Sequence, residues 1–225
     1  MPGNSRPPYD SFNLGLRSGE DENIVRANRM LLERALQLPS QPRWLQQVHG
    51  DRSLRVTEEV FDGEQQADAA FTTQSDIVLA ILTADCLPIL LCADDGSEIG
   101  AIHAGWRGLS AGIVESTIAR LRTPRSKLLA WMGPAIGGVS YEVGGEVRYA
   151  FVAKSSDAAS AFEATRPGHW LCDLYSLARQ KMCAIGVEKI FGGNFDTRAD
   201  ARFYSYRRDG ARSGRFASLI WLNAP

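Results

Sequence analysis

The chain has 225 residues, a length that fits a single domain, and its 44% hydrophobic content is enough to build a core. The formal net charge is -1 at pH 7, which argues against the basic surface of a nucleic-acid or anionic-membrane binder. No apolar run approaches the length of a membrane span, and residues 1–4 lack the pattern of a signal peptide. We therefore expect a soluble, cytoplasmic protein with no nucleic-acid and no membrane partner.

A helix is predicted in the first fifth of the chain. Asp21 is a suitable N-terminal cap, and Ile24, Leu31 and Leu38 would lie on the apolar side before Pro39 ends the helix. We expect this helix to cover a sheet.

Strand-like sequence follows from about residue 44 to residue 60, and another strand begins near Ala69. Residues 77–82 and 99–102 are short apolar runs that end in polar residues, as buried strands do. The Asp-Asp-Gly segment at 94–96 favours a chain reversal. We therefore expect the runs at 77–82 and 99–102 to return side by side.

Cys86 and His103 follow the ends of these two predicted strands, and His49 follows a third one that passes through Arg43, Trp44 and Leu45. Two histidines and a cysteine leave an open fourth position on tetrahedral zinc, as in catalytic sites. The alternative is that each is an ordinary core or surface residue, and spacing does not decide between the two.

The other cysteines, Cys92, Cys172 and Cys183, form no Cys-x-x-Cys pair with one another or with Cys86. In a reducing compartment we expect free thiols. A closed zinc site made of four cysteines is therefore not predicted.

The segment after His103 is rich in glycine, and residues 104–108 are poorly suited to a helix interior. Residues 109–121 have helical periodicity, so a glycine-rich loop would open a helix, where free N–H groups favour anions. Arg107 would add a planar fork for phosphate or carboxylate. A tight turn with a surface arginine fits the same residues.

Later elements follow from the same rules. Asp173 is a good cap for a helix that Gly186 ends, and His169 is interpreted as a loop histidine rather than a ligand. We expect strands at 128–132, 187–191 and 216–222, a loop at 133–138, and partly helical sequence at 142–152.

Six short motifs, in order along nearly the whole chain, resemble one known family. They are Phe-Asn-Leu-Gly at 12–15, Gln-Val-His-Gly at 47–50, Thr-Ala-Asp-Cys-Leu-Pro at 83–88, His-Ala-Gly-Trp-Arg-Gly at 103–108, Gly-Pro-Ala-Ile-Gly at 133–137 and Phe-Tyr-Ser-Tyr-Arg-Arg at 203–208. The chain resembles the laccase-domain family of bacterial polyphenol oxidases and purine nucleoside phosphorylases, the YfiH-like proteins. The resemblance implies an α+β fold with mixed sheets and covering helices, one catalytic domain over residues 1–225, and a metal held by His49, Cys86 and His103.

Two departures from the family pattern stand out. Family members usually have a further strand and a Thr-Arg-x-Gly-Gly-type segment before Pro-Tyr, so we expect a shortened N-terminal strand here. Family members often have Cys-Thr late in the chain, where this sequence has Asp196 and Thr197. Asp196 is a candidate acid, base or extra metal ligand, and equally a solvated loop residue.

The resemblance implies zinc-dependent phosphorolysis of adenosine, inosine and methylthioadenosine, with adenosine deamination as a side activity. Zinc lowers the pKa of bound water to about 7, which would serve deamination, whereas phosphorolysis needs an anion site. We expect Arg107, with Arg207 or Arg208, to hold phosphate. Asp85, beside Cys86, is the candidate base or orienting residue.

Two other activities remain open. Copper at the same three residues would give a polyphenol oxidase, although three histidines are too few for a multicopper laccase. Cys86 and His103 could instead form the nucleophile and base of a hydrolase that edits cell-wall precursors, with His49 orienting the substrate. The substrate is thus a nucleoside with phosphate, or a phenol, and the protein a monomer or homodimer.

Overall fold

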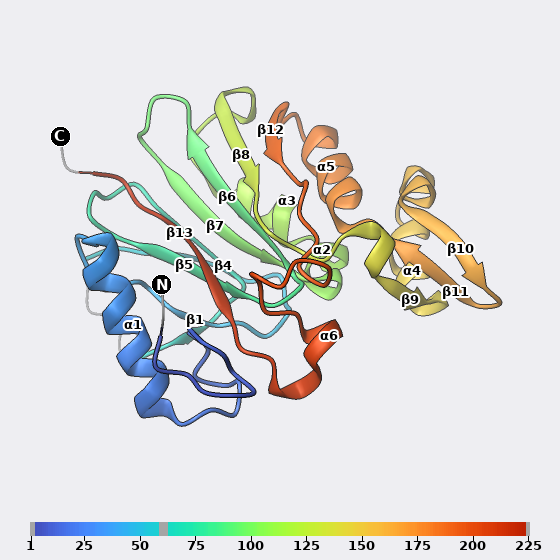
Figure 1. The fold of residues 1–225 in the computed structure, drawn as a ribbon. Coiled ribbons are helices and arrows are strands. Elements are labelled where there is room, and N and C mark those ends of the chain that lie inside the picture. Colours follow the sequence, from blue (N-terminus) through green and yellow to red (C-terminus); the bar gives the residue numbers. More distant parts are fainter. Residues whose placement is uncertain (1–2, 59–62, 224–225) are drawn as a thin grey trace.

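A six-stranded mixed sheet forms the centre of the computed structural model, which describes residues 3–58 and 63–223 (Figure 1). The inner strands pair antiparallel, and the strand at each edge pairs parallel to its neighbour. In spatial order the strands are β12 (Lys189–Gly192), β8 (Leu128–Met132), β6 (Leu87–Ala93), β7 (Ile99–Ala104), β4 (Ala69–Thr72) and β2 (Ser53–Arg55).

Alternating side chains divide the core into two layers. On β6, Leu87, Ile89 and Leu91 point to a large apolar cluster shared with helices on one face of the sheet, whereas Leu90 faces the opposite layer. The helices of the first layer are α2 (Trp106–Ala111), α3 (Ile113–Ile118) and α5 (Leu174–Ala184). The same alternation on β7 places His103 on the side opposite these helices.

The opposite layer contains a two-stranded antiparallel sheet of β5 (Leu79–Thr83) and β13 (Phe216–Ile220). These two strands lie far apart in the chain. Phe216, the first residue of β13, pairs with Thr83, the last residue of β5. A short parallel pair, β1 (Leu45–Gln46) and β3 (Gln65–Gln66), lies beside this layer.

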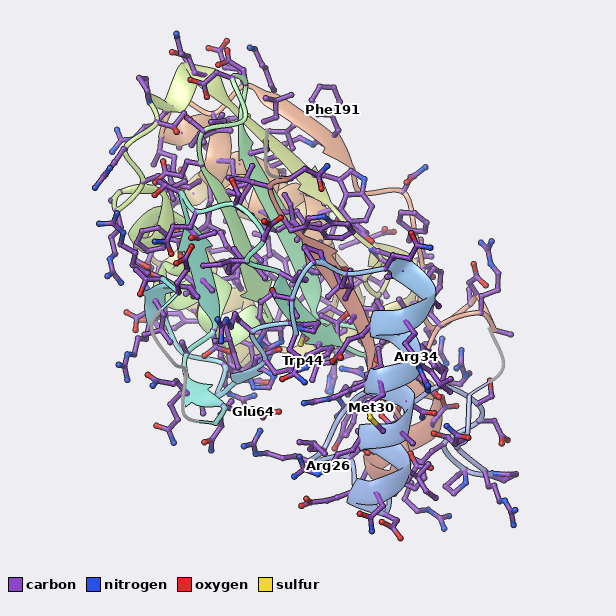
Figure 2. All side chains as sticks on the ribbon, turned by 90° about the vertical axis from the view of Figure 1, so that its left-hand side faces the viewer. Arg26, Met30, Arg34, Trp44, Glu64 and Phe191 are labelled. Atoms are coloured by element: carbon purple, nitrogen blue, oxygen red, sulfur yellow. The ribbon has the colours of Figure 1, made fainter. Side chains whose placement is uncertain are left out.

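Helix α1 (Glu22–Leu36) begins at the predicted cap, since the Asp21 side chain accepts from the Asn23 N–H. Its fully buried residues are Val25, Asn28 and Arg29, whereas the predicted Ile24 and Leu31 are half-buried and Leu38 lies beyond the end of the helix. Polar contacts set this orientation: Asn28 binds Ser5 and the Asn13 carbonyl, and Arg29 binds the Leu14 carbonyl. The helix therefore fixes the N-terminal segment. Arg26, Met30 and Arg34 lie on its exposed side (Figure 2).

A small antiparallel sheet projects from the main body on the other side, in the order β10 (Phe162–Arg166), β11 (His169–Cys172) and β9 (Glu142–Gly144). This hairpin was not predicted, and His169 begins a strand instead of lying in a loop. Helix α4 (Gly145–Val152) is shorter than the 142–152 segment considered, because its first three residues form β9. Shorter elements are α6 (Tyr206–Asp209) and the 3-10 turns Arg125–Lys127, Gly138–Ser140, Ser156–Ala161 and Gly210–Arg212.

Three further expectations need correction. Strand β5 does not pair with β7, because the turn at 94–96 joins β6 to β7. Strand β6 was not predicted, and it contains Pro88, a residue that disfavours a strand. The predicted helix at 109–121 is two helices, separated at Gly112, whose φ of 107° ends α2. Trp106 to Gly108 form the first turn of α2 and are not a loop.

The remaining elements agree with expectation. Strands β8, β12 and β13, the irregular segment at 133–137 and helix α5 with its Asp173 cap all occur where predicted, within a few residues. The α+β class with mixed sheets and covering helices is therefore confirmed. Within the ranges 3–58 and 63–223, none of the helices has the length and hydropathy needed to cross a bilayer.

Candidate metal centre and pocket

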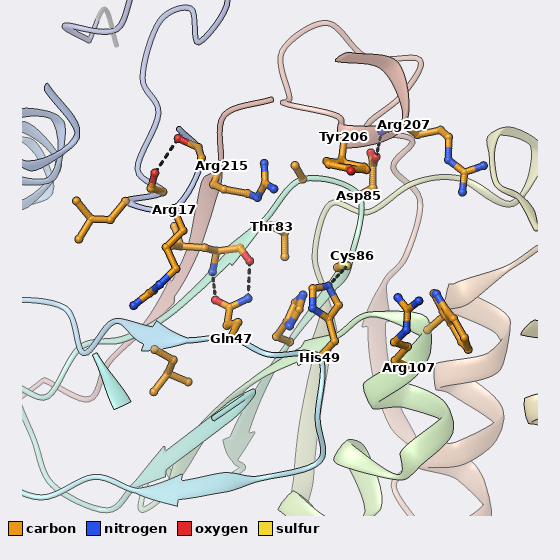
Figure 3. A pocket seen from close by; sticks show the side chains of 18 of the residues that line it. Arg17, Gln47, His49, Thr83, Asp85, Cys86, Arg107, Tyr206, Arg207 and Arg215 are labelled. Carbon is orange, nitrogen blue, oxygen red and sulfur yellow. Dashed lines mark hydrogen bonds between the residues drawn. The ribbon is translucent and has the colours of Figure 1, made fainter. Parts of the chain in front are cut away.

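A pocket of about 580 Å³ opens where the strand ends and the terminal segments meet (Figure 3). Its wall is built from parts of the chain that are far apart in sequence: the N-terminal segment, the turn between β5 and β6, the starts of α2 and α6, and the segment before β13. The residues that line it include Gly15, Arg17, Gln47, His49, Glu64, Thr83, Asp85, Cys86, His103, Trp106, Arg107, Tyr141, Tyr206, Arg207 and Arg215.

His49, Cys86 and His103 come together in this pocket. Each offers one donor atom, and the three atoms lie within 4.8 Å of one another; Cys86 Sγ is 3.7 Å from His49 Nε2. The two imidazole rings are 4.8 Å apart at their centroids and meet edge to face. Donors on tetrahedral zinc are about 3.5 Å apart, so small side-chain adjustments would allow the group to bind a metal with one open position.

Burial differs among the three candidate ligands. His103 is buried, Cys86 is half-buried and His49 is exposed, so the open side of the group faces the pocket. Because the segment that carries His49 has little regular structure, its position depends on side-chain contacts. Gln47 supplies one of them, since its amide bonds both the N–H and the carbonyl of Leu82 on β5, at 2.8 and 2.7 Å.

Asp68 orders both histidines, and the sequence analysis missed it. The carboxylate is fully buried; one oxygen lies 2.8 Å from His103 Nδ1 and also accepts from the His49 N–H at 2.8 Å. The other oxygen accepts from the Gly50 N–H at 2.8 Å. With Nδ1 donating to Asp68, Nε2 of His103 is left for a ligand. The signal was an aspartate directly before an apolar strand.

The protonation states follow from these contacts when no metal is bound. Burial opposes ionisation of Cys86, but His103 and His49 outweigh it and lower the pKa of the thiol to about 6. Burial also opposes protonation of His103, yet Cys86 and Asp68 raise its pKa to about 9. The pair is then a thiolate and an imidazolium, and the thiolate is the form that binds metals.

The surroundings of Gly105 explain why the His-Ala-Gly motif has a glycine at this position. A Cβ at this position would lie 2.9 Å from Cys86 Sγ and 2.9 Å from His49 Cδ2. The backbone φ is -67°, which any residue adopts, so glycine is needed here for space.

Asp85 lines the pocket, but both of its carboxylate oxygens are engaged. Oδ1 accepts from Thr197 Oγ1 and Oδ2 from the Arg207 N–H, each at 2.6 Å. The Ile136 N–H also bonds the Asp85 carbonyl at 3.0 Å. The residue has a φ of 88°, and its contacts hold the sharp turn that presents Cys86.

The predicted phosphate-binding arginines differ in their surroundings. Arg107 lines the pocket, is exposed, and lies 4.5 Å from the ring of Trp106. Arg207 also lines the pocket, but it donates to the Glu142 carbonyl at 2.6 Å and lies over Tyr141. Arg208 is directed to Asp209 and to nearby carbonyls and is not part of the wall.

Asp196 and His169 lie outside the pocket wall. The Asp196 carboxylate accepts from the Ser140 hydroxyl at 2.6 Å and from the Gly137 N–H at 3.1 Å, so it supports the loop after β8. His169 Nδ1 is 3.2 Å from the Pro167 carbonyl in the outlying sheet. Tyr141, which no sequence motif indicated, lines the pocket beside Arg207.

Comparisons with known proteins agree along nearly the whole chain. The family model described as multi-copper polyphenol oxidoreductase laccase matches residues 1–223. The chain is 51% identical over 233 residues to a protein of Xylella fastidiosa (strain Temecula1) named purine nucleoside phosphorylase, covering 98% of this chain and 88% of the relative. It is 48% identical over 221 residues to purine nucleoside phosphorylase YfiH of Escherichia coli (strain K12), covering 98% and 90%.

Solved structures have the same fold. The crystal structure of a Neisseria meningitidis protein matches with a TM-score of 0.94 at 40% identity, covering 100% of this chain and 91% of that one. YlmD from Geobacillus stearothermophilus matches with a TM-score of 0.93 at 28% identity, covering 100% and 89%. On its family match and these relatives, the chain belongs to the multi-copper polyphenol oxidoreductase laccase family.

Proposed function

We propose that this protein is a zinc-dependent purine nucleoside phosphorylase that acts on adenosine, inosine and methylthioadenosine. The observation that carries the proposal is the group of His49, Cys86 and His103, with donor atoms within 4.8 Å, lining a pocket of nucleoside size. The names of the Xylella and Escherichia relatives support this choice.

The reaction exchanges one bond for another at C1′ of the ribose. A phosphate oxygen forms a bond to C1′ while the bond from C1′ to the purine nitrogen breaks, and its electron pair leaves with the purine. The purine takes up one proton, which monobasic phosphate or water supplies. The products are the free base and the sugar 1-phosphate, which is ribose 1-phosphate from adenosine or inosine and 5-methylthioribose 1-phosphate from methylthioadenosine.

His49, Cys86 and His103 would hold the metal, which supplies a Lewis acid at the open position. Asp68 keeps Nε2 of His103 directed to the pocket and fixes the backbone of His49. Zinc suits this N, N, S donor set, and so does copper. With three histidines in the sequence, further histidine-held coppers have no ligands, which favours zinc and phosphorolysis over a laccase reaction.

The pocket wall offers partners for a flat base and its sugar. Trp106 and Tyr141 are aromatic, and Arg107 adds a guanidinium 4.5 Å from the Trp106 ring. Asp85 acts as an orienting residue, because Thr197 and the Arg207 N–H occupy both of its oxygens.

Adenosine deamination as a side activity would use the open metal position for water. One domain over residues 1–225, a cytoplasmic location and a monomer or homodimer are part of the same proposal.

The test is metal analysis of protein purified without added metal, followed by adenine release from adenosine with and without phosphate. We expect one zinc per chain and release that requires phosphate. His49→Ala should abolish both zinc binding and adenine release. His169 lies outside the pocket, so His169→Ala should leave zinc binding and adenine release unchanged.

Other outcomes would favour the alternatives. Stoichiometric copper with phenol oxidation and no nucleoside turnover would indicate a polyphenol oxidase. Activity that survives chelation but is lost on alkylation of Cys86 would indicate the hydrolase that edits cell-wall precursors.

A further inference from the structure

Arg215 is a pocket residue that the reaction described above leaves without a role. It directly precedes β13, and its backbone is fixed at both ends: its N–H donates to Asn13 Oδ1 at 2.8 Å and its carbonyl accepts from the Leu14 N–H at 2.9 Å. Its Nη1 donates to the carbonyls of Ser213 and Gly214, at 2.6 and 2.8 Å. The guanidinium is therefore held in one orientation before any ligand binds.

The charge of Arg215 has no carboxylate within ion-pairing distance in the part of the chain that the structure describes. Arg17, on the same pocket wall, is paired with Glu64. Burial lowers the pKa of Arg215, and the negative charges of Cys86 and Asp85 only partly offset this. A half-buried cation without an ion-pair partner destabilises the folded protein, and a bound anion would offset this destabilisation.

The N-terminal segment leaves space for this arginine. A Cβ at Gly15 would lie 2.7 Å from Arg215 Cγ, so glycine allows the Phe-Asn-Leu-Gly motif to approach the side chain closely. The same motif supplies Asn13, which binds the Arg215 backbone. Segments from opposite ends of the chain thus build one position in the pocket.

Two donor groups of the Arg215 guanidinium have no partner among the described residues. Within residues 3–58 and 63–223, Nε and Nη2 of Arg215 have no hydrogen-bond partner, and these two atoms form one edge of the planar fork. That edge matches two oxygens of a tetrahedral oxyanion. Arg107, by contrast, is exposed on the first turn of a six-residue helix, and its guanidinium makes no hydrogen bond to described residues.

We propose that Arg215, and not Arg107, binds the phosphate that attacks the nucleoside. This inference rests on the proposed phosphorylase function. Figure 3 shows Arg215 beside β13 and the N-terminal segment, across the pocket from Arg107 on α2, with Cys86 and His49 between them. Attack and departure at C1′ take place on opposite faces of the sugar, so phosphate at Arg215 leaves the opposite wall, with Trp106 and Arg107, for the purine.

The test compares Arg215→Lys and Arg215→Ala with Arg107→Ala, and uses Arg212→Ala, an exposed arginine outside the pocket, as the matched control. We expect the KM for phosphate to rise about 10- to 100-fold in both Arg215 variants, because a charge-assisted bidentate contact is lost. The KM for adenosine should change much less. Arg107→Ala should show the opposite pattern, and guanidinium ion at low millimolar concentration should restore Arg215→Ala in part.

Calorimetric titration of the metal-loaded proteins with inorganic phosphate gives a readout that does not need turnover. Phosphate binding by the wild type and its loss in Arg215→Ala would support the subsite. Gly15→Ala displaces the arginine without removing its charge and should also weaken phosphate binding, which covers the case in which the Arg215 variants fail to fold.

The two proposals can fail separately. If adenine release requires phosphate but Arg215→Ala keeps the wild-type KM for phosphate and its heat of binding, the inference is wrong and the function stands. If the wild type binds phosphate through Arg215 but releases no purine, the function is wrong and the anion subsite stands. Loss of phosphate binding in Arg107→Ala alone would place the phosphate on α2 and overturn the inference.

Discussion

At the scale of single residues, Asp68 links the two histidines of the candidate metal group. One buried carboxylate accepts from a ring nitrogen of His103 and from the backbone of the His49 segment. The second histidine is thereby oriented through the main chain, in which His49 has a φ of 60°. Loss of such an outer carboxylate usually lowers metal affinity without removing the ligands.

Asp68→Asn should therefore weaken zinc binding about 10- to 100-fold. The amide keeps the size of the side chain but loses the charge. Its NH₂ group would face one of the N–H groups from which the carboxylate accepts a hydrogen bond. Competition titration against a chromophoric chelator measures the change. Asp95→Asn, in the turn between β6 and β7, is the control and should bind zinc as the wild type does. Equal affinities for both variants would contradict this role of Asp68.

Gly105 provides a second test at this scale. Gly105→Ala should lower zinc affinity by about tenfold or more while leaving the Tm of the metal-free protein nearly unchanged, because the new methyl crowds Cys86 and His49 and the backbone φ tolerates alanine. Gly100 lies on β7, the strand that directly precedes Gly105. Gly100→Ala adds a methyl in ordinary van der Waals contact and is the matched control. Undiminished zinc binding by Gly105→Ala would show that the ligands can move aside.

At the scale of elements, irregular segments carry the pocket, and side chains hold them in place. The segment after β8 has few backbone bonds of its own, and Asp196 supplies acceptors for Gly137, Ser140 and the Arg198 N–H. Burial opposes ionisation of Asp196, but these donors lower the pKa of the carboxyl below its ordinary value of 3.8. The ionised form therefore stabilises the loop.

Asp196→Asn should lower the free energy of unfolding by about 1 to 2 kcal/mol at pH 7. Because the folded-state pKa is below the unfolded value, the contribution of Asp196 is complete above about pH 4 and is lost as the pH falls through the folded pKa. Urea unfolding at pH 7 and pH 3 should thus show a difference from wild type that shrinks in acid. Glu163→Gln, which removes an exposed charge on β10, should show neither effect. A difference that persists at pH 3 would be evidence against an ionised Asp196.

At the scale of the whole molecule, the candidate ligands meet only when the two layers are assembled. His49 follows β1, Cys86 lies between β5 and β6, and His103 is on β7, so the unfolded chain has no preformed group. A metal that binds only the folded state stabilises it by mass action.

Removal of the metal should therefore lower the Tm by roughly 10 °C, since a ligand at 1,000 times its Kd contributes about 4 kcal/mol and 1 kcal/mol corresponds to about 2–4 °C at this size. Scanning calorimetry with and without a strong chelator measures the shift. Cys86→Ser should melt at the same temperature in both conditions, whereas Cys183→Ser, at an exposed thiol, should keep the full shift. A Tm of the wild type that does not respond to the chelator would be incompatible with a metal bound at this group.

The sequence by itself determined the features that depend on neighbouring residues. The caps at Asp21 and Asp173 and the apolar runs of β5, β7 and β8 are local signals, and the structure has these elements within a few residues of the predicted positions. The family motifs also pointed to His49, Cys86 and His103, which the fold brings together.

Only the tertiary structure decided what depends on contacts between distant residues. Strand β6 is a strand because β7 and β8 pair with it on both sides, although Pro88 argues locally against one. Asp68 and Arg215 carry no local signature of their roles, since their partners are far away in the chain. Strand pairing, burial and hydrogen bonding are properties of the folded arrangement, and hydrophobic periodicity does not encode which distant segments become neighbours.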